Sequence, residues 1–211
     1  ETAGRFTSLQ DIANALSADS VFCSEVKEVI SLLLQYKTAY EKDDNSLLQD
    51  FPLKLHGVYT KAQIQVAIGT STLGRKSPSR EGVERNKHLN IEAMFVDIIK
   101  NREEGSTTDY DDKAISPYLF QWDTQNSVNP ESPTGQAYIN ETQTMLLFVR
   151  EQKTFAEDKS RTMGYVYLGR VTLHSWEYKN LGTRRQMQIL WDMVEPIPGS
   201  VMHFARIKEV I

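Results

Sequence analysis

The segment from Tyr110 to Tyr138 carries the residue types best suited to chemistry or recognition. It combines two adjacent acids, three alternating aromatic residues, and a series of amides and hydroxyls. Aromatic faces that stack on a ligand, together with fixed donors and acceptors at its edge, suit a pocket for a flat, partly polar molecule. The competing interpretation is a half-buried strand from Pro117 to Gln125, followed by a polar loop.

The adjacent acids Asp111 and Asp112 have three interpretations. A carboxylate can accept a hydrogen bond from the exocyclic amine of cytosine. Paired carboxylates can also perform general acid–base catalysis, which would make the protein a hydrolase. Two acids in front of a strand, without an EF-hand pattern, most often form an ordinary polar turn.

Aromatic residues alternate through the same segment. Tyr118, Phe120 and Trp122 share one face if this stretch is a strand. We expect Phe120 to pack in the core and Trp122, beside the polar run DTQN, to lie nearest a ligand. The amides of Gln125 and Gln136 either complete recognition of the ligand edge or cap the loop and the following helix.

The other chemistry-bearing residues form no catalytic or metal motif. Cys23 is the single cysteine, which excludes an internal disulfide and a cysteine zinc site and fits a reducing cytoplasm. The sequence has no glycine-rich phosphate loop of either common type. We therefore expect no cofactor and no metal; the histidines are scattered, at His56, His88, His174 and His203.

Composition and charge narrow the class of protein. The net charge of −4 argues against a strongly electrostatic nucleic-acid binder, although basic residues gather at Arg75–Arg80 and at Arg184–Arg185. No apolar run reaches the length of a transmembrane helix, so we expect no membrane partner. The first residues, ETAGRFTSLQD, contain neither an initiator Met nor an apolar signal core, so we expect a piece of a longer polypeptide.

The elements that position these residues follow from periodicity. Residues 6–40 have helical spacing, whereas alternating β-rich segments predominate from Leu89 onward. Short helices are predicted after Thr60, ending at Gly69, after the cap Ser132, and after Pro198. The sequence thus predicts a helical segment over 1–45. Residues 46–211 should form an α+β domain, with a curved antiparallel β-sheet or partly open barrel and flanking helices.

The run AISPYLFQWDTQNSVNPESPTGQAYI, with TMLLFVRE and ILWDMVEPIPGSV further on, resembles a known family. It is similar to the C-terminal domain, long of unassigned function, of bacterial superfamily 2 helicases that carry phospholipase-D-like nuclease domains. RFTSLQDIANAL, GVYTKAQIQVAIG and a Gly-Val turn, here GVERN, extend the resemblance over almost the whole chain. Thr124 stands where the commoner form of the motif has Ser, which keeps the hydroxyl.

The resemblance implies a function as well as a fold. Such proteins resemble type IV restriction enzymes, which are ATP-dependent bacterial, cytoplasmic nucleases that cut DNA containing 5-methylcytosine or 5-hydroxymethylcytosine. Their C-terminal domain would then read the modified cytosine in duplex DNA by base flipping, in a fold like the SET- and RING-associated class, without catalysis of its own. Its partners would be that DNA and the helicase and nuclease domains of the same polypeptide. The alternative is a coupling or assembly domain that packs on the helicase and never reads a base.

Within this hypothesis, two sets of residues would contact the DNA. Aromatic rings would stack on the extruded base, an acid would accept from its amine, and hydroxyl and amide side chains would hold the pocket loop or bond the base. That set comprises Tyr110, Asp111, Asp112, Tyr118, Trp122, Thr124, Gln125 and Gln136. A second, basic set would contact phosphates: Arg75, Lys76, Arg80, Arg184 and Arg185.

Overall fold

The computed structural model describes residues 8–40, 51–72, 74–78, 82–99, 110–126, 128–181 and 184–206. The chain divides into two compact units. The first comprises residues 1–52 and 71–76, and the second comprises residues 53–70 and 77–211. Among the described residues, no helix is long and apolar enough to cross a membrane.

The first unit contains the two long helices predicted for its sequence, α1 (Leu9–Ala18) and α2 (Ser20–Tyr40). Ser8 begins α1 with a capping box, in which its hydroxyl accepts from the Asp11 N–H while the Asp11 carboxylate accepts from the Ser8 N–H. No residue of α1 is buried. Apolar side chains on both helices are therefore exposed, among them Leu9, Val21 and Val29.

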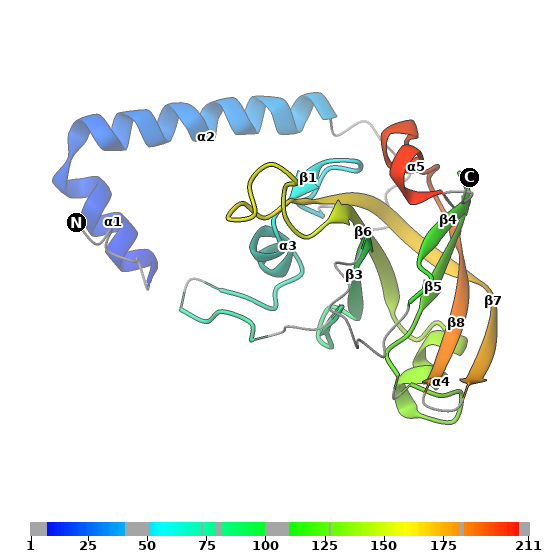
Figure 1. The fold of residues 1–211 in the computed structure, drawn as a ribbon. Helices are drawn as coiled ribbons and strands as arrows, with labels where there is room; N and C mark the ends of the chain where they lie inside the picture. The colour runs from blue at the N-terminus through cyan, green and yellow to red at the C-terminus, as the bar shows by residue number, and fades with distance from the viewer. Residues whose placement is uncertain are drawn as a thin grey trace. The chain divides into compact units, whose positions relative to one another are not determined.

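The second unit is α+β, as predicted, with a large, mostly antiparallel and open sheet (Figure 1). In the described residues the strand order is β2-β3-β6-β7-β8-β5-β4, and β1 pairs with β7. The strands are β1 (Val58–Tyr59), β2 (Val83–Asn86), β3 (Ile91–Ile99), β4 (Lys113–Ser116), β5 (Leu119–Asp123), β6 (Thr144–Gln152), β7 (Tyr165–Leu181) and β8 (Arg184–Met193).

Two features of the sheet differ from the sequence prediction. β3 and β6 pair in parallel, with Phe95 opposite Phe148, whereas every other strand pair is antiparallel. The GVERN segment, expected as a turn, instead contributes β2, which pairs with β3. The turn instead comprises residues 87–90, after β2, and its last residue, Asn90, has a positive φ of 56° and leads into β3.

The sheet has a hydrophobic core on each face, because β3 and β6 alternate between them. One core contains Met94, Val96, Leu147 and Val149 together with Trp191. On the other face the Phe148 ring stacks on Phe95 and on Tyr167, with centroids 5.7 Å and 4.8 Å apart. Ile64 of α3 (Lys61–Ala67) is also fully buried, as is Ile68, which directly follows this helix. The predicted Thr60 cap of α3 is confirmed.

Two short helices, α4 (Pro133–Ile139) and α5 (Gly199–Ala205), lie at opposite ends of the sheet (Figure 1). Both were predicted, and the hydroxyl of Ser132 caps α4 by accepting from the Gly135 N–H at 3.1 Å. A Cβ on Gly135 would lie 2.0 Å from the Asn129 carbonyl oxygen and 3.1 Å from the Met187 sulfur. Glycine is therefore required where α4 meets the preceding loop and β8.

We predict that Gly135→Ala lowers the free energy of unfolding by about 1–3 kcal/mol, because the added methyl group overpacks this contact. The matched control is Gly199→Ala, since a Cβ there would meet nothing within 4 Å. Urea unfolding followed by circular dichroism measures both. Equal stabilities for Gly135→Ala and the parent chain would contradict this account of α4.

Candidate functional site

A cavity of about 340 Å³ opens between the β2–β3 edge, the end of β5 and α4. Its volume falls at the lower end of the roughly 300–1,000 Å³ typical of small-molecule sites. Trp122, Tyr138, Glu92 and Val128 form buried walls, and the remaining side chains are half-buried at the rim. The lining residues are Val83, Arg85, Glu92, Trp122, Gln125, Val128, Ser132, Thr134 and Tyr138.

The aromatic wall is made by Trp122 of β5 and Tyr138 of α4, with Trp191 of β8 behind them. The Trp122 and Tyr138 centroids lie 5.5 Å apart at an interplanar angle of 79°. Trp191 lies 6.5 Å from Trp122 and 6.4 Å from Tyr138. Because the two wall rings meet edge to face, they cannot sandwich a flat ligand between parallel planes. A ligand in the cavity can stack on one ring and touch the other.

A buried carboxylate, Glu92, forms the polar part of the wall. Oε1 of Glu92 accepts from the Tyr138 hydroxyl at 2.6 Å, and Oε2 accepts from Nε and Nη2 of Arg85 at 2.6 Å and 2.5 Å. The Glu92 side chain is 2% exposed and that of Arg85 is 28% exposed. Burial and the negative charge of Glu92 raise the pKa of the Tyr138 hydroxyl, so it remains a neutral donor.

Side-chain hydrogen bonds hold the loop between β5 and α4 in place. The hydroxyl of Thr124 accepts from the Met187 N–H at 2.9 Å and continues the attachment to β8 beyond β5. The Gln136 amide donates to the Pro130 carbonyl oxygen at 2.6 Å. Ser132 donates to the Asn129 carbonyl oxygen at 2.6 Å. Thr124 and Gln136 therefore hold the loop, one of the two roles expected for them, and Gln125 lines the cavity.

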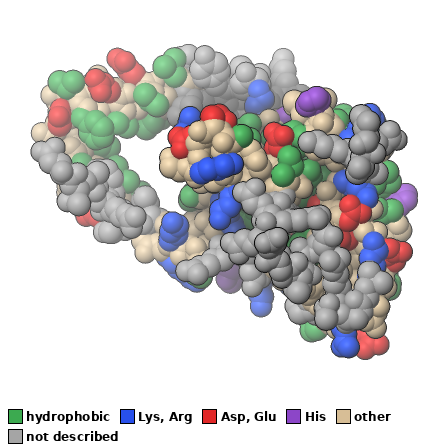
Figure 2. All heavy atoms as spheres, viewed as in Figure 1, with side chains coloured by type: hydrophobic (Ala, Val, Ile, Leu, Met, Phe, Trp, Pro, Cys, Tyr) green, Lys and Arg blue, Asp and Glu red, His purple; other side chains and the backbone are tan. Residues whose placement is uncertain are grey.

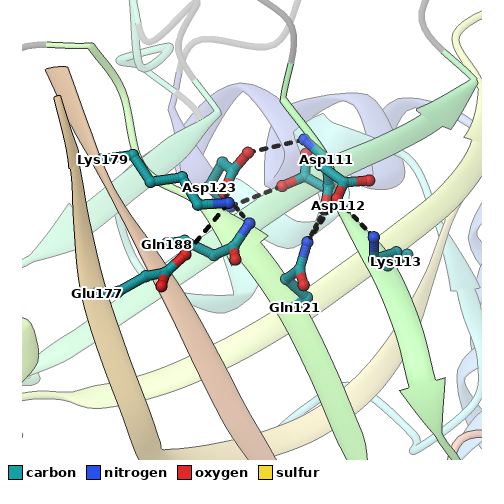
Figure 3. Close-up of polar contacts among 8 residues, drawn as sticks. All are labelled: Asp111, Asp112, Lys113, Gln121, Asp123, Glu177, Lys179 and Gln188. Carbon is teal, nitrogen blue, oxygen red and sulfur yellow. Dashed lines mark hydrogen bonds and ion pairs between the residues drawn. The ribbon is translucent and has the colours of Figure 1, made fainter. Parts of the chain in front are cut away.

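Asp111 and Asp112 lie in a separate polar network, shown in Figure 3. The Asp111 carboxylate accepts from Lys113 at 2.5 Å and from the Gln121 amide at 2.9 Å, and Asp112 accepts from the Asp123 N–H at 2.9 Å. Gln121 and Asp123 alternate with Trp122 along β5, so they point to the opposite face of the strand. The structure therefore does not bring the two predicted acids to the cavity.

The network has a structural role in this arrangement. The Asp111 N–H donates to Asp123 Oδ2 at 2.8 Å, and the Gln188 amide donates to Asp123 Oδ1 at 2.9 Å. Desolvation, the largest single contribution, raises the pKa of the Asp111 carboxyl, but the hydrogen bonds from Lys113 and Gln121 and the charges of Lys113 and Lys179 together hold this pKa below its usual value. These contacts fasten the segment before β4 to β5 and β8.

Other predicted residues lie elsewhere. Tyr110 is half-buried beside Asp112 and does not line the cavity; burial and that charge raise its pKa. Tyr118 is 57% exposed, in the turn before β5, at the far end of that strand from the cavity. Arg185 is exposed on β8, which begins at Arg184.

The expected phosphate contacts at Arg75 and Lys76 belong to the first compact unit, whereas the cavity belongs to the second. Arg80 lies outside the described residues. Within the described ranges no group of three or more His, Cys, Asp or Glu side chains is placed to hold a metal ion.

Sequence reasoning missed Arg85, Glu92 and Tyr138. One signal for Glu92 was present: a single acid inside the otherwise apolar run IEAMFV. A charge in such a run is stable in the interior only when it is paired and hydrogen-bonded. Its partners lie seven and 46 residues away, and the more distant one was beyond the reach of local patterns.

The chain belongs to the family described as a domain of unknown function (DUF3427), which matches residues 53–204. The matched segment includes every residue that lines the cavity. No curated protein is similar enough to the chain to match it.

We predict that Tyr138→Phe lowers the free energy of unfolding at neutral pH by about 1–3 kcal/mol, because the buried Glu92 carboxylate loses a donor.

The raised pKa of Tyr138 means that only the unfolded state ionises this group just above pH 10. Its contribution to stability is therefore complete below pH 10 and decreases as the pH rises further. Tyr138→Phe should reduce the alkaline loss of stability by about 1 kcal/mol between pH 10 and 11. Urea titrations of both proteins at neutral pH and across this alkaline range measure the two effects.

Proposed function

We propose that this protein is the non-catalytic target-recognition domain of an ATP-dependent type IV restriction enzyme in the bacterial cytoplasm. It would bind duplex DNA and hold one 5-methylcytosine or 5-hydroxymethylcytosine, rotated out of the helix, in the cavity between β5 and α4. The observation that carries the proposal is the cavity itself, with an aromatic wall and a buried carboxylate. The resemblance to helicase-associated C-terminal domains supports the enzyme context.

The lining residues match the groups of a cytosine ring. The carboxylate of Glu92 has about four lone-pair positions, so it can accept from an exocyclic amine in addition to Tyr138 and Arg85. The guanidinium of Arg85 has five N–H donors and can donate to the ring carbonyl. Glu92 thus takes the role that the sequence suggested for Asp111 or Asp112.

The energies are of the right order for modest discrimination. Unstacking a base costs a few kcal/mol, and each aromatic stack returns about 1–3 kcal/mol. A methyl group in contact with Val83 or Val128 adds about 0.8 kcal/mol, which corresponds to roughly four-fold in affinity. Specificity above that level requires a tight fit around the 5-position.

The charge visible on one face of the molecule favours no strong long-range attraction to DNA. On the face shown in Figure 2, Lys and Arg side chains are interspersed with Asp and Glu rather than gathered in one large patch. Affinity for DNA should then depend more on direct contacts at the cavity and its rim than on long-range electrostatic attraction to the phosphates.

The test is fluorescence anisotropy at fixed salt with matched duplexes that carry one cytosine or one 5-methylcytosine. Glu92→Gln should weaken binding of the methylated duplex about ten-fold, because a charge-assisted acceptor is lost. The control is Glu84→Gln, which changes another buried Glu on the neighbouring strand β2, where it accepts from Gln65 at 2.8 Å and does not line the cavity.

Equal affinity of the parent chain for the two duplexes would exclude modification reading. Equal binding by Glu92→Gln and Glu84→Gln would exclude the cavity as the place where the base is held. Thermal unfolding of each variant shows whether a loss of binding reflects a loss of folded protein.

A coupling role is the second candidate, favoured by the first unit. Val29 and Ile30 of α2 are among the apolar side chains that this unit leaves exposed. In the intact enzyme, Val29→Ser with Ile30→Ser should lower DNA-stimulated ATP hydrolysis while DNA binding stays unchanged. Ser24→Ala, also exposed on α2, is the control. Unchanged ATP hydrolysis in the double variant would rule out coupling through this face.

A further inference from the structure

The β7–β8 ribbon continues beyond the strands that flank it. β6 pairs with β7 no further than Met145 opposite Val171, and β5 pairs with β8 up to Asp123 opposite Gln188. Thr124 continues the contact with β8 as far as Met187, and the ribbon then runs on from the pair Lys179–Gln186 to the pair Leu181–Arg184. Three further residues per strand extend it by roughly 10 Å. Figure 1 shows this end of β7 beside α4.

One face of the ribbon carries exposed aromatic side chains just before this projection begins. Trp176 lies opposite Ile189 and Tyr178 opposite Met187, so both rings point to the same side of the sheet as those core residues. They are nevertheless 39% and 38% exposed. By the same alternation the exposed Arg185, opposite Asn180, continues this row.

The row lies next to the cavity. Ile189 is paired on one side with Trp176 and on the other with Trp122, which forms the cavity wall. Met187 packs against Gly135, which directly follows Thr134 at the rim of the cavity. A ligand too large for the cavity that lay across its rim at α4 would therefore meet the ribbon.

The charge of the ribbon identifies the kind of partner. In the sequence, residues 176–185 contain three basic residues (Lys179, Arg184 and Arg185) and one acid (Glu177), in a chain whose net charge is −4. Lys179 pairs with Glu177 at 3.4 Å on the face opposite Trp176 and Tyr178, so the basic side chain described on the aromatic face is that of Arg185. A two-stranded β-ribbon fits the major groove of B-form DNA, and aromatic rings beside basic groups suit sugars, bases and phosphates. We propose that the β7–β8 ribbon is an arm that contacts the duplex flanking the extruded base, which rests on the proposed function of the cavity.

The test measures binding of the 211-residue chain to methylated and unmethylated duplexes as a function of salt. Trp176→Ala with Tyr178→Ala should weaken binding to both duplexes about ten-fold and leave their affinity ratio unchanged. Arg185→Ala, which removes an exposed side chain, should weaken binding to both duplexes about equally. It should also reduce the slope of log K against log salt concentration by about 1. Tyr118→Ala is the control, since it removes an exposed aromatic residue distant from the cavity.

The outcomes separate the arm from the cavity. Unchanged duplex affinity in Arg185→Ala and in a folded aromatic double variant would overturn the arm, whatever the cavity binds. A loss of affinity for both duplexes, in a parent chain that does not distinguish methylated from unmethylated DNA, supports the arm while the proposed function fails. If the substitutions weaken only binding to the helicase and nuclease domains, the ribbon is a protein contact and the proposal is wrong.

Discussion

The buried carboxylate of Glu92 is the interaction on which the site depends. It joins three elements, because it lies on β3 and accepts from Tyr138 of α4 and from Arg85 of β2. An ionised group in the interior is stable only with such partners, so the carboxylate fixes where α4 lies relative to the sheet edge. The cavity is the space left beside this contact, and Trp122 closes its other side. The packing of α4 on the sheet edge therefore depends on these three side chains, and recognition of the proposed base would depend on them as well.

Much of the fold could be predicted because its signals are local. Ser132 followed by Pro133 marks the start of α4, and Thr60 marks the start of α3. Strand alternation correctly placed Phe120 and Trp122 on one face of β5. The parallel pairing of β3 with β6 could not be predicted, because the intervening segment contributes β4, β5 and α4, and pairing across it depends on tertiary packing rather than on local pattern.

The candidate site was harder to predict than the fold. Trp122, Gln125 and the loop role of Thr124 were accessible from the WDTQN motif and its composition. Asp111 and Asp112 were expected to contact the extruded nucleobase because they are close in sequence to the aromatic strand. The alternation of side chains instead places their partners, Gln121 and Asp123, on the opposite face of β5. The acid of the cavity comes from β3, and only the three-dimensional arrangement identifies it.

The central claim is that this cavity encloses a single modified nucleobase beside Glu92. A crystal structure of the chain with a short duplex containing one 5-methylcytosine tests it most directly. The account predicts that the methylated base has left the helix, that its amine lies within hydrogen-bonding distance of Glu92, and that one face rests on Trp122 or Tyr138. A bound duplex with that base still paired and stacked, and the cavity filled only by water, would contradict it.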